Sequence, residues 1–298
     1  MTIDFHTHTF PEKIAARTIG ILSGKSHSRA FTDATNPGLL ASMQEAGIDL
    51  SVVLPVATAP RQVEHINDSA LAVNRSYFEG AEAESRGMLL SLGCMHPDYE
   101  NWEAELERIA REGLKGIKIH PVYQGVDIDD PRYVRILKKC SELGLLVVMH
   151  AGDDIGFPGV VHCSPAMTRR AYEKAPGLDM VLAHMGGWHN WDEVPGYLSD
   201  LPVWLDTAFS TGEIPVLDDH YYKPEDLPML NEEAFLKIVD AFGTERILFA
   251  TDSPWADQRA TLEWIRRLPL SSDDREAILG GNALRLLKKA GVVPALKQ

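Results

Sequence analysis

Short runs of apolar, often β-branched residues alternate along the chain with longer segments of helical pattern. This alternation is typical of βαβ units, in which helices join parallel strands. Most of the runs are hydrophobic without interruption, which indicates strands that are covered on both faces. Eight runs are predicted as strands: residues 3–5, 50–56, 88–94, 116–120, 145–150, 179–184, 203–207 and 247–251.

The segments between the predicted strands carry the helical pattern. They include residues 38–46, 63–85, 102–112, 133–143, 164–174 and 232–242. A glycine follows each of them closely, at Gly47, Gly87, Gly113, Gly144, Gly177 and Gly243. Because a glycine just after a helix readily takes the left-handed conformation that ends it, these positions are predicted as helix ends.

Eight strands with helices between them predict an α/β fold, a distorted (β/α)₈ TIM barrel, which typically needs about 250 residues. The chain has 298 residues, and its surplus falls at residues 151–164 and 209–230. Both insertions follow strand ends, on the face where barrel enzymes build their active sites. An open doubly wound sheet is the alternative, but no glycine-rich phosphate loop follows the first strand. We predict a single barrel domain over residues 1–298.

Charge and composition exclude several classes of partner. The chain has 29 basic and 43 acidic residues, a net charge of −14, and no basic run that could bind a nucleic-acid backbone or anionic lipid. It has no uninterrupted apolar stretch near about 18 residues and no secretory pattern at its start. Its three scattered cysteines do not predict disulfides. We therefore expect a cytoplasmic protein that acts on a small molecule. We also expect a homodimer, because this is the commonest oligomer of soluble proteins.

A pair of histidines, His6 and His8, marks the end of the first predicted strand. Side chains alternate along a strand, so these two imidazoles point the same way and could share a metal ion. Three more polar residues end other strands: His150, His184 and Asp252. In a parallel barrel these ends meet at one rim.

Imidazoles together with a carboxylate suit a divalent ion, with Zn²⁺ as the first prediction and Mn²⁺ as the harder alternative. The alternative interpretation is that isolated polar residues cap buried strands. For a single histidine that interpretation is better. Four histidines and one aspartate, all at strand ends, favour a metal site.

Several motifs stand in the same order along the chain as in a known family. They are IDFHTH at 3–8, GIKIHP at 116–121, TDSP at 251–254 and GNALRLL at 281–287, together with the strand ends His150 and His184. This set resembles the amidohydrolase superfamily, and within it the amidohydrolase-2 branch that includes aminocarboxymuconate semialdehyde decarboxylases. The resemblance covers nearly the whole chain and does not name a substrate.

The resemblance implies a distorted barrel that holds one divalent ion through His6, His8, His150 and Asp252. It also implies that His184 assists catalysis or binds a second ion. A bound metal lowers the pKa of its water ligand to about 7 and polarises a carbonyl. Asp252 could accept the proton of that water, and His184 could stabilise developing charge, so both are predicted to be catalytic.

Lys118 and His120 share one face of the fourth predicted strand. Some superfamily members carry a carboxylated lysine on this strand that bridges two metals. We favour a mononuclear site in which Lys118 is a buried cation paired with a carboxylate, and keep the bridge as the alternative. His120 is expected near the rim in contact with substrate, where Arg61, Tyr123 and Trp255 could also line the pocket.

Two enzymatic functions use this set of residues. The first is a hydrolase that uses metal-activated water on an amide, ester or lactone, and we prefer it because hydrolysis is the commoner chemistry of the superfamily. The second is a non-oxidative decarboxylase of the aminocarboxymuconate semialdehyde decarboxylase type. A barrel that binds metal without turnover is a third hypothesis, which predicts a site closed by protein ligands.

Overall fold

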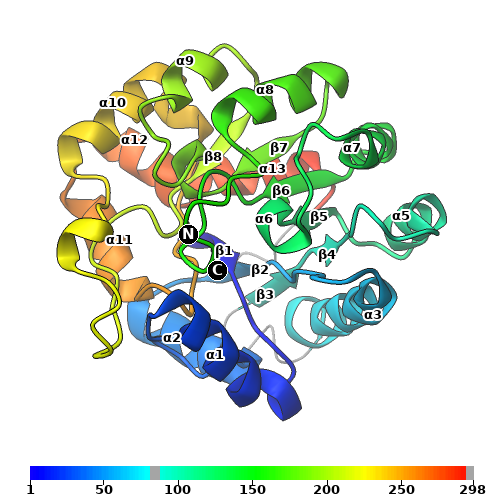
Figure 1. Ribbon diagram of the computed structural model, residues 1–298, viewed down its shortest axis with the longest axis horizontal. Coiled ribbons are helices and arrows are strands. Elements are labelled where there is room, and N and C mark those ends of the chain that lie inside the picture. The colour runs from blue at the N-terminus through cyan, green and yellow to red at the C-terminus, as the bar shows by residue number, and fades with distance from the viewer. Residues whose placement is uncertain (81–87, 293–298) are drawn as a thin grey trace.

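The computed structural model describes residues 1–80 and 88–292. Its parallel strands lie at the centre, with helices around them (Figure 1). Each predicted run forms a strand, and the third run forms two: β1 (Ile3–Thr7), β2 (Leu50–Val53), β3 (Met88–Ser91), β4 (Gly93–Cys94), β5 (Gly116–Ile119), β6 (Leu146–Met149), β7 (Met180–Leu182), β8 (Trp204–Asp206) and β9 (Ile247–Leu248). The strands pair in the orders β1-β2-β3 and β4 to β9.

Hydrogen bonds outside the regular ladders close these two sheets into one barrel. At the seam between the last and first strands, the Phe5 N–H donates to the Phe249 carbonyl at 2.9 Å. The Asp252 N–H donates to the His6 carbonyl at 2.8 Å. The predicted (β/α)₈ barrel is confirmed, and its seam places the end of β1 beside the residues that follow β9.

The third barrel strand is interrupted at Leu92, between β3 and β4. Here two asparagine side chains replace ladder hydrogen bonds. The Asn74 amide exchanges bonds of 2.6 and 3.0 Å with the Ser91 backbone, and Asn67 Oδ1 accepts from the Cys94 N–H at 2.7 Å. The strand is split because these asparagine side chains, and not the neighbouring strand alone, form hydrogen bonds with its backbone N–H and C=O groups.

The barrel is surrounded by helices, which are α1 (Glu12–Ser26), α2 (Asn36–Ala46), α3 (Val63–Val73), α5 (Trp102–Arg111), α6 (Pro121–Gln124), α7 (Pro131–Leu143), α8 (Pro165–Lys174), α9 (Val194–Leu198), α10 (Glu232–Phe242), α11 (Gln258–Arg267), α12 (Ser272–Glu276) and α13 (Asn282–Lys289). Gly47 and Gly144 end α2 and α7 in the predicted left-handed conformation. In the segment predicted as one helix over residues 63–85, the α-helix ends at Val73, and a short π-helix, Asn74–Phe78, follows it. Its last predicted residues, and Gly87, lie outside the described residues.

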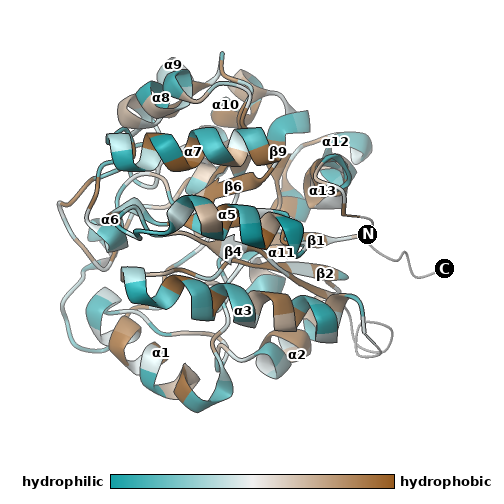
Figure 2. Ribbon diagram, turned by 90° about the vertical axis from the view of Figure 1, so that its right-hand side faces the viewer, coloured by the Kyte–Doolittle hydropathy of each residue, from teal (hydrophilic) through white to brown (hydrophobic). Residues whose placement is uncertain are grey.

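Strand side chains alternate between two hydrophobic cores. Inward residues such as Phe5, Val52, Leu90 and Val148 fill the barrel, while Val53, Leu89, Val147 and Met149 face the helices. Three residues of α13, Ala283, Leu286 and Leu287, join the inner core. This helix covers the end of the barrel where the strands begin, as Figure 2 shows, and the site is therefore built at the opposite end.

Asp4 is a fully buried carboxylate at the barrel seam. It accepts hydrogen bonds from the Thr251 hydroxyl at 2.6 Å, the Thr251 N–H at 3.0 Å and the Gln258 amide at 2.7 Å. Burial raises its pKa to about 6. This network fixes β1 against the chain that leads to Asp252.

Asp4→Ala is expected to lower the free energy of unfolding by about 2–4 kcal/mol, because it leaves buried donors without an acceptor. Urea denaturation at pH 7 measures the change. Asp218→Ala, at an exposed position, is the control and should change stability by less than about 0.5 kcal/mol. A loss below about 1 kcal/mol for Asp4→Ala would contradict this role.

Candidate metal centre

His6, His8 and Asp252 converge where β1 and β9 end. The two histidine Nε2 atoms lie 3.1 Å apart. Asp252 Oδ1 lies 3.0 Å from His8 Nε2 and 3.3 Å from His6 Nε2. Asp252 takes a left-handed backbone conformation, with φ of 69°. A non-glycine residue held in this way is typical of functional sites.

The outer hydrogen bonds of the two histidines determine which ring nitrogens are free. His8 Nδ1 lies 2.7 Å from the Leu54 carbonyl, which can only accept, so Nδ1 carries the proton. His6 Nδ1 lies 2.9 Å from Asp206 Oδ2 and donates to it. Both Nε2 atoms therefore present lone pairs to each other and to Asp252 Oδ1, which is buried and has no hydrogen-bond partner.

Three lone-pair donors at such distances repel one another unless a cation lies among them. Two neutral imidazoles and a carboxylate are suitable ligands for a divalent metal. Burial also lowers the pKa of His6 well below its ordinary value, which keeps the ring neutral and able to bind metal. The residues present therefore fit the predicted metal.

His150 and His184 form a second contact of the same kind. His150 Nε2 donates to the Asp153 carbonyl, and His184 Nδ1 donates to the Ala208 carbonyl, each at 2.9 Å. His150 Nδ1 and His184 Nε2 consequently face each other with lone pairs, 2.9 Å apart. This contact requires a shared proton or a cation. The His184 ring lies 5.4 Å from that of His6, so the pair adjoins the first three ligands. That His150 completes the ligand set stays a prediction.

His120 has a different environment. Its ring stacks on His150, with centroids 4.0 Å apart. Its Nδ1 accepts from the Tyr123 N–H at 3.4 Å, so its Nε2 carries the proton and points to Asp154 Oδ2 at 3.4 Å. The ligand atoms of His120, His150 and Asp154 are close enough for a metal, so they form a second candidate group.

Lys118 lies beneath the centre, almost completely buried. Its Nζ lies 3.1 Å from His6 Nε2, so it could donate to that lone pair only where no ion is bound to it. Burial lowers the pKa of Lys118 to about 8, and the nearby Asp206 and Asp252 oppose this shift. Burial likewise raises the pKa of Asp206 to about 7, opposed by Lys118. The amine thus sits as a buried cation close to two carboxylates.

The remaining predicted residues lie around the rim. The Tyr123 ring packs edge-on against His120, with centroids 4.6 Å apart. Trp255 is half-buried, and its backbone N–H donates to the Asp252 carbonyl. Arg61 lies in an exposed 3₁₀ turn, Pro60–Gln62. Their predicted contacts with substrate stay predictions.

Two carboxylates at the site were not predicted. Asp206 ends β8, so the rule that identified the other strand ends applies to it equally. Asp154 lies in the insertion at 151–164, and only the folded loop brings it to His120. The sequence contains no local signal for its position.

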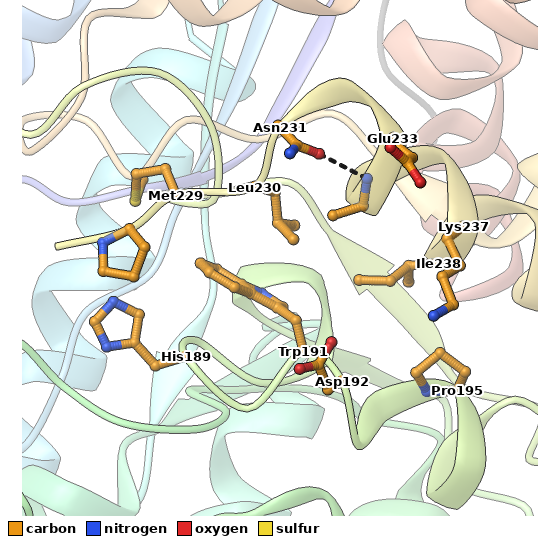
Figure 3. A pocket seen from close by; sticks show the side chains of 12 residues that line it. His189, Trp191, Asp192, Pro195, Met229, Leu230, Asn231, Glu233, Lys237 and Ile238 are labelled. Carbon is orange, nitrogen blue, oxygen red and sulfur yellow. Dashed lines mark hydrogen bonds between the residues drawn. The ribbon is translucent and has the colours of Figure 1, made fainter. Parts of the chain in front are cut away.

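Two cavities border the segment 188–192, which follows His184 along the chain. The larger, of about 500 Å³, is lined by residues from the segment 189–192, the loop before α10, and the two helices α9 and α10. Figure 3 shows Trp191 in its middle, between His189 on one side and Ile238 and Lys237 on the other. The Trp191 indole N–H donates to the His184 carbonyl at 2.9 Å. The smaller, of about 130 Å³, is lined by Asp154, Trp188, His189 and Tyr222 among others, so it borders the carboxylate that faces His120.

The amidohydrolase-2 profile matches residues 3–289. The chain belongs to this family. It is therefore placed among the enzymes of the amidohydrolase superfamily, as the motif set indicated. No helix in the described residues is long and apolar enough to cross a membrane.

Relatives with known names are distant. A 2-amino-3-carboxymuconate-6-semialdehyde decarboxylase from Dictyostelium discoideum is 26% identical over an alignment of 209 residues, and the match covers 61% of this chain and 56% of that protein. The chain thus matches little more than half the length of this curated relative.

Solved structures share the fold. An uncharacterised TIM-barrel protein from Bordetella bronchiseptica has a TM-score of 0.72 and 21% identity, with 98% of this chain and 99% of that chain covered. A dihydroxybenzoic acid decarboxylase from Polaromonas sp. JS666, with bound manganese, has a TM-score of 0.66 and 16% identity, with 96% of each chain covered.

Asp206→Asn is expected to weaken metal affinity about 10- to 100-fold, because the charged acceptor that orients His6 is lost. Titration of metal into chelator-treated protein measures this. Asp154→Asn is the matched control and should stay within about twofold of the wild type, since Asp154 pairs with a protonated nitrogen. An equal loss in both variants would place Asp154 in the ligand set and contradict the assignment.

Proposed function

We propose that this protein is a metal-dependent, non-oxidative decarboxylase of a small aromatic or conjugated carboxylic acid. From the sequence alone, hydrolysis is preferred because it is the commoner chemistry of the superfamily. We now prefer decarboxylation, because both reported relatives whose names give an activity are decarboxylases. The observation that carries the proposal is the position of His184, whose ring lies 5.4 Å from that of His6 and whose Nε2 can take up a proton beside the metal ligands.

His6, His8 and Asp252 would hold the divalent ion, with His150 as the predicted fourth ligand. When bound, the ion would neutralise the substrate's negative charge and polarise an oxygen of the substrate. The histidine-rich donor set suits zinc, and the Polaromonas enzyme holds manganese. Asp206 and the Leu54 carbonyl keep the ligand rings in the tautomers that bind metal.

Decarboxylation breaks the bond between a carbon and its carboxylate. The electron pair stays on that carbon, CO₂ leaves, and the carbon takes up one proton. His184 Nε2 would hold the proton that is donated, and the Ala208 carbonyl, which accepts from His184 Nδ1, orients the ring for this transfer.

His184→Gln is expected to reduce kcat about 10²- to 10⁴-fold in CO₂ release from the metal-loaded protein, because the proton donor is lost. The assay uses dihydroxybenzoates and the aminocarboxymuconate semialdehyde as substrates. His162→Gln, on the insertion and paired with Asp127 at 2.6 Å, is the control and should keep full activity.

A different outcome would identify the hydrolase. If the metal-loaded wild type releases no CO₂ from these acids but hydrolyses esters, lactones or amides, the proposed reaction is wrong. The metal centre would remain, with Asp252 as the acceptor of the water's proton.

A further inference from the structure

A lysine that the sequence analysis did not single out lies at the rim of the site. Lys25 stands in the last turn of α1, and its ammonium lies 3.1 Å from the centroid of the Phe157 ring. It lies 5.1 Å from the Tyr123 ring. Two aromatic side chains, one from the insertion at 151–164 and one from α6, thus receive a cation from a distant helix.

A chain of ring contacts connects Lys25 to His120 and His150. The Tyr123 ring contacts His120, and His120 stacks on His150. Around Gly156 the three groups converge: an added Cβ would lie 3.1 Å from Asp154 Oδ1, 3.3 Å from the Tyr123 hydroxyl and 3.6 Å from Lys25 Cγ. Asp154 also lines the smaller cavity, so a ligand in that cavity comes toward the side of Gly156 where Lys25 lies.

Lys25 has no ion-pair partner within residues 1–80 and 88–292, although the chain carries a net charge of −14. Lys25 is an exposed residue, but the partial burial of its ammonium lowers its pKa, and Asp154 is the carboxylate whose charge opposes that shift. A lysine in the last turn of a helix commonly interacts with the helix dipole alone. Here the ammonium lies instead over two rings, where it can contact both a π face and an anion.

The end of α1, which carries Lys25, is held by contacts with the insertion at 209–230, which in turn contacts the insertion at 151–164. His27, which ends α1, donates to Asp219 at 2.6 Å and stacks on Tyr221 with centroids 3.6 Å apart. The Tyr222 hydroxyl donates to the Ile155 carbonyl at 2.8 Å. These contacts hold the end of α1 in place, so the ammonium is positioned before a ligand arrives.

We propose that Lys25 binds a second anionic group of the substrate, remote from the carboxylate that reacts, and so selects dianionic acids. This inference rests on the proposed function, since it extends the same site. Lys25 acts by charge and by a hydrogen bond to the anion, and the aromatic pair Tyr123 and Phe157 excludes water on one side. It takes no part in breaking the carbon–carbon bond.

The test compares matched ligands on metal-loaded protein by calorimetric titration. Two pairs differ only in the second carboxylate: benzoate with terephthalate, and biphenyl-4-carboxylate with biphenyl-4,4′-dicarboxylate. In the wild type, the dianion of at least one pair should bind about tenfold more tightly than its monoanion. Lys25→Met should abolish this preference and leave monoanion binding within about twofold, while Lys25→Arg should restore it.

Lys13→Met is the control, because Lys13 is an exposed lysine on the same helix. It should keep the preference. The inference is overturned if the wild type prefers neither dianion, if it binds none of the four acids, or if Lys25→Met weakens both members of a pair equally. CO₂ release is measured separately. An enzyme that releases CO₂ but does not prefer the dianion contradicts only the role of Lys25. A protein that prefers the dianion but releases no CO₂ contradicts only the decarboxylase proposal.

Discussion

The whole site depends on an electrostatic constraint at the carboxyl ends of the strands. The unprotonated nitrogens of His6 and His8 face each other and a buried oxygen of Asp252, with no donor of their own except the Lys118 amine. Lone pairs held this close are stable only with positive charge among them. A divalent cation satisfies this need and also gives the centre its chemistry.

The barrel supplies the force that holds these acceptors together. Two hydrophobic cores, one inside the strands and one beneath the helices, fix the positions of the strand ends. Asp4 then ties β1 to Thr251, directly before Asp252. Asp206 and backbone carbonyls accept hydrogen bonds from the outer nitrogens of the histidine rings and so fix their tautomers. The rigid backbone therefore determines which ring nitrogens are free to bind a metal.

The sequence predicts the elements of this architecture well where the signal is local. Uninterrupted apolar runs predict the strands, and the spacing of two between His6 and His8 predicts that they share a face, which the 3.1 Å contact shows. Asp206 could have been found by the same rule. Asp154 and Lys25 could not, because their positions depend on how two long insertions and α1 pack against the rim. The split of the third strand depends likewise on Asn67 and Asn74, which reach it from another element.

The most direct test of the metal centre is metal content by elemental analysis, on chelator-treated protein reconstituted with Zn²⁺ or Mn²⁺ and then freed of excess ion. The account predicts about one ion per chain in the wild type and almost none in His6→Ala and Asp252→Ala, with all three proteins folded. A wild type that retains no metal, or variants that retain as much as the wild type, would contradict it.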